Sequence, residues 1–157
     1  MTVPALLILY KYAQGALALN LEGFSDEEAL VAPPRGGNCA NWIAGHVLVY
    51  RDRIHALLER APAWPQSLGS NAQYLRGSTG FEPQRAIPLS QLREALDLSA
   101  PVVIEALCAA TEELLARQAT ESATVAERLA FGGFHEGYHA GQLGLLRRVS
   151  GKAGQIP

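Results

Sequence analysis

The chain has 157 residues, which suits one domain with a single core, and apolar residues make up an ordinary 48% of it. Its formal net charge is −2 and its few basic residues are scattered, which argues against nucleic acid as a partner. No segment reaches the roughly 18 uninterrupted apolar residues that a membrane-spanning helix needs, so we expect one domain over residues 1–157 that works without a membrane.

The first helix is expected over about Val3–Leu21. This stretch is apolar, but Lys11 interrupts it and no basic residue precedes it, so the charged start of a secretion signal is missing. Gly23 is the expected stop. Ser25 and Glu28 then form a capping-box pattern, which opens a short helical turn.

The second helix is expected to begin after Asn38 as its cap and to end near Arg60. Prolines and glycines then punctuate a long polar connection over about 62–88. A connection of this length is typical of a functional loop or of a crossover between distant helices.

The third helix is expected from about Ser90 to near Gln118, with Pro101 inside it. The fourth starts near Ser122 or Thr124 and stops at Gly151. Alternating β-branched runs are absent, so we expect no sheet. Four helices with one long crossover between the second and third predict an all-α four-helix bundle.

Two cysteines bear on the cellular location. Cys39 and Cys108 are far apart and belong to no metal or redox motif. We predict that both are reduced thiols, each a small buried hydrophobic residue, in a cytoplasmic protein.

Two of the four histidines recur at helical spacing near the end of the chain. His135 and His139 lie one turn apart on the same helix face, where two neutral imidazoles can bind one metal ion. A catalytic zinc usually takes three protein ligands. His46 is the candidate third, because it shares a mostly apolar face of the second helix, whereas His55 should point outward.

Another interpretation of these histidines stays open at this point. A histidine on an apolar face is more often a hydrogen-bonded core residue than a ligand, and a helical interaction module of that kind would bind no metal. Glu136 follows His135 as in the HExxH zinc motif, but it points about 100° away, so it should miss the metal and face solvent or another helix.

Two motifs together resemble the DinB/YfiT-like superfamily of four-helix metal-binding proteins. They are NWIAGH on the second helix and HEGYHAGQLGLLRR at the end, in the right order, and the DRIHALL, PLSQL and GKAG segments extend the similarity over most of the chain. The resemblance implies a divalent metal held by three histidines, matching His46, His135 and His139. It also implies a long crossover and often a homodimer. Family members include thiol-dependent transferases that use small cellular thiols.

Three further residues are candidates for work at such a site. Gln142 lies on the face of His139 and can hydrogen-bond a bound water or a substrate, or join helices. Tyr50 can donate a proton or pack. Arg53 can clamp a substrate carboxylate, or lie along apolar surface with its head in water.

These observations predict a divalent-metal protein acting on a small molecule. Zinc is the expected ion and nickel fits the same ligands; ligand type alone does not choose between them. The expected activity is that of a thiol-dependent S-transferase with a low-molecular-weight thiol as cosubstrate, a form borrowed from the resemblance. The alternatives are a metal-dependent hydrolase and a non-catalytic, stress-related bundle that binds a metal or a small molecule.

Overall fold

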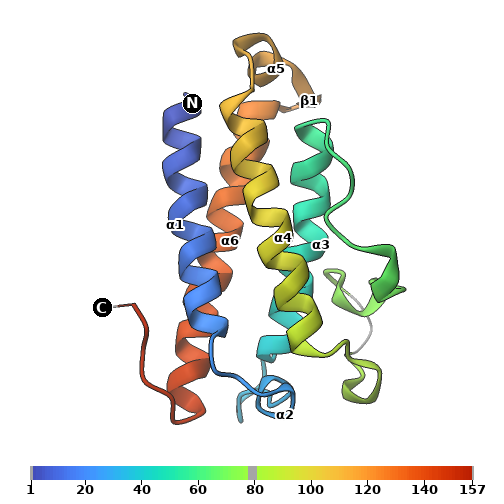
Figure 1. Cartoon of the computed structure of the whole chain (residues 1–157), viewed down its shortest axis with the longest axis vertical. Coiled ribbons are helices and arrows are strands. Elements are labelled where there is room, and N and C mark those ends of the chain that lie inside the picture. Colours follow the sequence, from blue (N-terminus) through green and yellow to red (C-terminus); the bar gives the residue numbers. More distant parts are fainter. Residues whose placement is uncertain (1, 78–80, 157) are drawn as a thin grey trace.

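In the computed structural model, which describes residues 2–77 and 81–156, four long helices form a bundle (Figure 1). They are α1 (Val3–Leu21), α3 (Ala40–Leu57), α4 (Leu89–Cys108) and α6 (Val125–Val149). The predicted all-α four-helix fold is therefore confirmed. Within the described ranges, no helix has both the length and the apolar character to cross a membrane.

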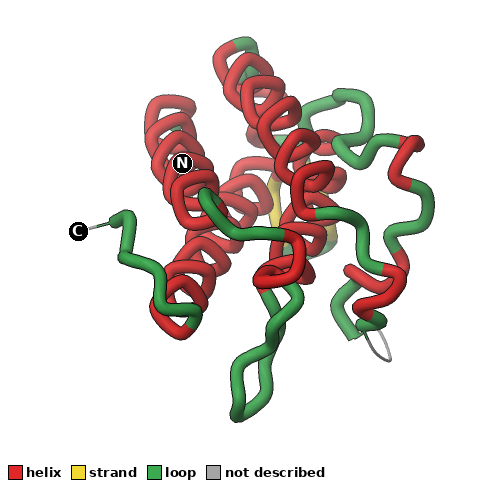
Figure 2. The backbone as a smooth tube through the Cα atoms, turned by 60° about the horizontal axis from the view of Figure 1, so that its bottom comes forward, coloured by secondary structure: helices red, strands yellow, loops and turns green. Residues whose placement is uncertain are grey.

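The four helices pack in a ring in which α1 neighbours α6, α6 neighbours α3, α3 neighbours α4 and α4 neighbours α1. In Figure 1, α1 and α6 run downward, whereas α3 and α4 run upward. Because α3 and α4 are parallel, the chain between them has to return along the outside of the bundle. The long connection is this return, as predicted, and Figure 2 shows it as loop with short helical turns. These turns are η1 (Gln66–Leu68), η2 (Ala72–Tyr74) and η3 (Pro83–Arg85).

The segment between α4 and α6 differs from the prediction. The third long helix ends at Cys108 rather than near Gln118, and α5 (Glu112–Ala116) follows as a separate short helix. Thr111 begins this short helix by accepting a hydrogen bond from the Leu114 amide. A small antiparallel pair, β1 (Gln118–Thr120) and β2 (Ala123–Thr124), then leads into α6, so the expectation of no strands was wrong.

Caps at the helix ends explain where the chain turns. Ser25 and Glu28 form the predicted capping box at the start of α2 (Asp26–Ala29), and Thr124 and Glu127 form a second one at the start of α6. The second long helix begins after Cys39 and ends at Leu57, slightly inside the predicted range.

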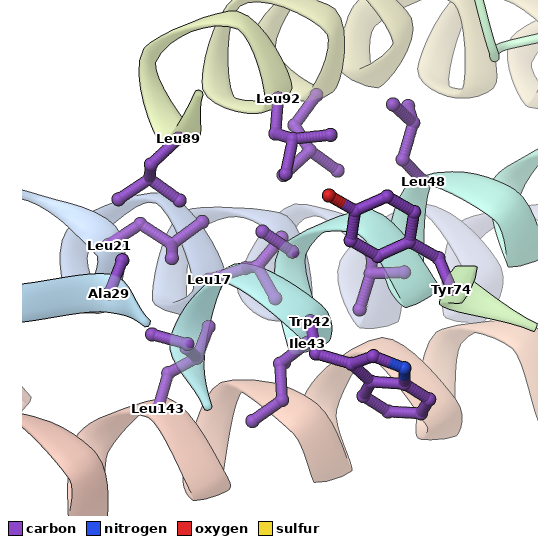
Figure 3. Packing of buried hydrophobic residues seen from close by; sticks show 14 of the residues in the cluster. Leu17, Leu21, Ala29, Trp42, Ile43, Leu48, Tyr74, Leu89, Leu92 and Leu143 are labelled. Atoms are coloured by element: carbon purple, nitrogen blue, oxygen red, sulfur yellow. The ribbon is translucent and has the colours of Figure 1, made fainter. Parts of the chain in front are cut away.

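Two clusters of buried side chains fill the bundle. The cluster at the lower end in Figure 1 joins α1, α3, α4 and α6 and includes Leu17, Ile43, Leu92 and Leu143, some of which Figure 3 shows meeting from different helices. The other lies toward α5 and includes Leu6 and Val103. Cys39 belongs to the first cluster as expected, but Cys108 is exposed, because the helix ends there at the surface.

Glycines on α6 give a matched test of how closely the helices approach. A Cβ added at Gly132 would lie 2.2 Å from Cδ1 of Ile54 and 2.6 Å from the Tyr10 hydroxyl, whereas one at Gly137 would meet nothing within 4 Å. We expect Gly132→Ala to destabilise the protein by about 1–3 kcal/mol through overpacking. Gly137→Ala should stabilise it by up to about 1 kcal/mol, because alanine is the better helix former. Urea denaturation of both variants measures this, and equal effects at the two positions would contradict it.

Candidate metal centre

Three imidazole rings from two helices meet inside the bundle between α3 and α6. The Nε2 atom of His135 lies 3.2 Å from that of His46 and 3.2 Å from that of His139. Among the described histidine, cysteine, aspartate and glutamate side chains, these three residues form the group that could hold a metal ion, with all possible ligand atoms within 4.8 Å of one another. The structure therefore brings together all three histidines that the sequence selects.

Helix geometry places each histidine. His135 and His139 follow one another by one turn on α6, and His46 faces them from α3, which packs against α6. His46 and His139 are buried, and His135 is partly buried. Two packed helices thus supply all three histidines.

Hydrogen bonds at the far nitrogens fix two of the rings. Nδ1 of His46 lies 2.8 Å from the Tyr74 carbonyl oxygen, and Nδ1 of His139 lies 2.8 Å from the amide oxygen of Gln142. Because both oxygens can only accept, each Nδ1 must donate its proton, which leaves a lone pair on each Nε2. The Gln142 amide nitrogen donates to the Tyr138 hydroxyl at 3.1 Å, which is consistent with this orientation.

Aromatic rings hold the imidazoles from the sides. Trp42 stacks on His46 with ring centroids 4.5 Å apart, and Tyr50 stacks on His135 at 4.0 Å. Trp42, His46 and Tyr50 follow at intervals of four on α3, so one helix face carries a histidine of this group between two aromatic rings. Tyr50 therefore packs against a histidine, and its suggested role as a proton donor stays a prediction.

The long connection reaches this centre through Tyr74, which is fully buried. A Cβ on Gly45 would lie 2.2 Å from Cδ1 of Tyr74, so the glycine lets this ring pack directly on α3. That close approach brings the Tyr74 carbonyl to His46. Trp42 supports the same segment, because its indole nitrogen donates to the Gln73 carbonyl oxygen at 2.9 Å.

Burial keeps the three imidazoles neutral. It lowers the pKa of His135 to about 3, helped by repulsion from the other two rings, and lowers the pKa of His139 to about 4 against the opposing Gln142 hydrogen bond. The pKa of His46 is lowered by burial and, less strongly, by the charges of Arg53 and Arg76. Neutral imidazole is the form that binds a metal ion.

These lowered pKa values predict that acid destabilises the metal-free protein. In the unfolded chain a histidine titrates near 6.5. Below that pH these histidines become protonated in the unfolded chain. In the folded protein His139 is protonated only at about pH 4 and His135 only at about pH 3. Above pH 6.5 the stability contributed by these neutral histidines is therefore fully present. As the pH falls toward 4 and below it is lost, and the free energy of unfolding decreases by at most about 1.4 kcal/mol per pH unit and group.

Urea denaturation of chelator-treated protein at pH 7.5, 6.5 and 5.5 measures this loss. The His135→Asn/His139→Asn variant should show a clearly smaller loss over the same range. If the free energy of unfolding fell equally with pH in the variant and the wild type, His135 and His139 would not be the cause of the loss.

Two observations test whether a metal ion fits these residues. Metal–nitrogen bonds of 2.0–2.1 Å in a tetrahedral site place ligand nitrogens about 3.3 Å apart, close to the 3.2 Å observed for both pairs that include His135. In addition, without a metal ion a single proton on Nε2 of His135 would have to form hydrogen bonds to the lone pairs of both His46 and His139. A cation between the three nitrogens can bind all three lone pairs. The donor set therefore fits a divalent ion.

Arg53 and Gln142 lie in different positions relative to this centre. Gln142 contacts Nδ1 of His139, so it orients the ring of a candidate ligand. Arg53 is exposed, and its guanidinium carbon lies 5.3 Å from the Tyr50 ring centroid. Their roles in a reaction stay predictions.

One expectation near the site needs correction, and the structure decides between two others. His55 does not point outward: it is 3% exposed, and its Nδ1 lies 2.7 Å from the Ala61 carbonyl oxygen, because the chain folds back over it after α3. Of the two positions expected for Glu136, solvent or another helix, the structure shows the second: it faces α3 and makes a buried ion pair with Arg51 at 2.9 Å. As expected, Glu136 is not part of the three-histidine group.

Sequence reasoning missed Arg51. It lies in α3 between Tyr50 and the exposed Arg53, and nothing in the local pattern separates a buried arginine from an exposed one. The useful signal was Glu136, a carboxylate on the inner side of α6 that needs a cationic partner once it is buried.

Comparison with known proteins supports this architecture. The family model of the DinB superfamily matches residues 9–143. The crystal structure of a conserved protein from Enterococcus faecalis superposes with a TM-score of 0.74, covering 96% of this chain and 98% of that one at 20% sequence identity, which shows a shared fold. A search of the curated proteins finds no match to this sequence.

Proposed function

The chain belongs to the DinB superfamily, and from this premise we propose that it holds one divalent metal ion on His46, His135 and His139 and acts as a thiol-dependent S-transferase. The observation that carries the metal part is the convergence of three Nε2 atoms on one point between α3 and α6. The transferase part rests on the resemblance to family members that use small thiols.

The protein's own residues supply binding, orientation and exclusion of water. The ligands are neutral, so the ion keeps its full charge, and its chemistry when bound is to lower the pKa of a thiol or a water that it coordinates. Gln142 and the Tyr74 carbonyl hold two of the rings, and Trp42 and Tyr50 cover their faces. Within the described residues the group has three members, which leaves a position for a small ligand.

Zinc is the ion that we propose for the cell, because imidazole nitrogens at tetrahedral spacing suit it. Nickel suits the same donors, so a purified sample can carry it instead. Elemental analysis of protein purified without a metal-affinity step identifies the ion that the cell supplies.

The transferase is tested by reloading chelator-treated protein with zinc and supplying a thiol with a chloronitrobenzene as electrophile. In the expected reaction, a sulfur–carbon bond forms as the carbon–chlorine bond breaks, chloride leaves, and the thiol proton passes to solvent. Mass spectrometry of the conjugate measures the rate. Turnover should require zinc and be absent from the metal-free protein.

The alternatives predict different results in the same assays. Ester or amide cleavage without thiol would identify a metal-dependent hydrolase instead. Stoichiometric metal with neither activity would favour the non-catalytic, stress-related bundle. Protein that binds no metal under any loading condition would refute the proposal and identify a helical interaction module with core histidines.

A further inference from the structure

A cavity of about 430 Å³ lies at the end of the bundle where α5 leads into β1, and none of the three histidines lines it. It lies where α3, β1 and the start of α6 meet, and its lining includes three arginines, Arg53, Arg117 and Arg128. Its remaining lining residues are apolar or uncharged, so no carboxylate lines it. A cavity lined by three guanidinium groups attracts anions.

Two of these arginines carry charge that no partner neutralises. Glu59 pairs with Arg117, with 2.6 Å between the charged atoms. Arg53 and Arg128 form no ion pair with a carboxylate anywhere in residues 2–77 and 81–156. Their positive charge is therefore available to a ligand.

Aromatic rings connect both arginines to the metal centre. The guanidinium of Arg53 lies over Tyr50, which stacks on His135, and the guanidinium of Arg128 lies 5.7 Å from the centre of the Phe131 ring. The Phe131 centroid is in turn 6.4 Å from that of His135. Each arginine is thus one aromatic ring removed from the same histidine.

The spacing along the helices sets the length of a ligand that spans both sites. Arg53 follows His46 by seven residues on α3, and Arg128 precedes His135 by seven on α6. Seven residues correspond to about 10 Å of helix. The helices are antiparallel, so both arginines lie on the same side of the centre.

We propose that this cavity, defined by Arg53, Arg117 and Arg128, binds the oxyanion end of an elongated substrate or thiol whose other end reaches the three histidines about 10 Å away. The ligand class is a small molecule with a carboxylate or phosphate at one end and the reacting group at the other. The inference rests on the proposed function for the identity of the reacting end, but the oxyanion site can be tested without metal.

The first experiment uses metal-free protein and sulfur-free probes. Succinate or inorganic phosphate is added at constant ionic strength, and the side-chain Nε–H resonances of the arginines are followed by NMR. Arg53 and Arg128 should shift with saturation, whereas Arg85, an exposed arginine paired with Glu82, should not. The probe that binds more tightly shows whether the site prefers a carboxylate or a phosphate. Equal, non-saturating shifts at all arginines would overturn the proposal, whatever the metal centre does.

The second experiment tests whether one ligand of the right length can contact both the oxyanion site and the metal. Cobalt-loaded protein is titrated with mercaptooctanoate, the neutral mercaptooctanol of the same length, and the short mercaptopropionate, and sulfur–cobalt absorption reports binding. The long acid should bind about tenfold more tightly than the alcohol, and the short acid should gain no such advantage. Arg53→Gln/Arg128→Gln should abolish the preference without weakening the alcohol, and Arg85→Gln should change neither.

The outcomes separate the two proposals. If the long acid and the alcohol bind alike in the wild type, the oxyanion site is refuted while thiol binding at the metal stands. If no thiol gives an absorption band but succinate or phosphate saturates Arg53 and Arg128, the thiol chemistry fails and the oxyanion site is supported.

Discussion

Replacing His139 by alanine is expected to abolish stoichiometric metal binding. The remaining two rings, His46 and His135, would leave a tetrahedral ion with only two protein ligands, and such sites rarely retain an ion against a chelator. Elemental analysis after gel filtration measures the loss, with one ion per chain expected in the wild type. The variant should stay folded, because the other buried residues of α6, the helix that carries His139, still pack in the bundle.

The matched control is His55→Asn, since His55 is buried but lies outside the centre. Asparagine can still donate a hydrogen bond toward the Ala61 carbonyl oxygen that His55 contacts. This variant should keep its metal. Loss of metal from His55→Asn but not from His139→Ala would contradict the assigned ligand set.

A smaller effect is expected from Gln142→Leu. The variant keeps all three imidazoles but removes the oxygen that accepts the Nδ1 proton of His139. Outer hydrogen bonds of this kind typically change metal affinity by about 10–100-fold. Competition with a coloured zinc chelator measures it, and affinity equal to that of the wild type would show that the ring needs no such support.

The four helices and the three histidines were predictable because both follow from short-range patterns. Helical spacing brings His135 and His139 to one face of α6, and the apolar face of α3 turns His46 inward. The capping boxes and the stop at Gly151 are local as well. For these features the residues that decide the structure are close together in the sequence.

The support that the long connection gives to the centre was not predictable, because it depends on contacts between distant segments. Tyr74 lies 28 residues beyond His46, in a connection without periodicity, and it meets that ring through a main-chain oxygen that no sequence motif marks. The burial of His55 likewise follows from the path of the chain after α3. Helix periodicity alone assigns a face to a side chain but does not say what covers that face.

The homodimer stays a prediction. Apolar side chains exposed on α1 and α6, among them Tyr12, Tyr138 and Leu145, offer a surface for it.

The second large effect is expected at the buried ion pair beside the centre. Arg51 and Glu136 are each 1% exposed, with 2.9 Å between their charged atoms, and Arg51 also donates to the Leu96 carbonyl oxygen and the Ser99 hydroxyl. Glu136→Leu would leave the guanidinium buried without its counter-charge. We expect a loss of about 3–5 kcal/mol in the free energy of unfolding, a large part of the 5–15 kcal/mol typical of a domain.

Urea denaturation of three variants separates charge from packing. Arg51→Leu/Glu136→Leu removes both charges and should recover most of the loss, because apolar pairs of similar volume often replace a buried ion pair without penalty. Glu82→Gln removes one partner of the exposed pair with Arg85 and should cost less than about 1 kcal/mol. If the double variant were as unstable as Glu136→Leu, packing rather than the unpaired charge would explain the loss.

The same variants distinguish what holds the fold from what holds the metal. Glu136 follows His135 directly on α6 but belongs to the ion pair, so Arg51→Leu/Glu136→Leu should stay folded and keep its metal. His139→Ala should do the reverse, losing the metal while unfolding near the urea concentration of the metal-free wild type. Metal loss in the stable double variant would mean that the ion pair positions His135 for binding, and would extend the centre to a fourth and fifth residue.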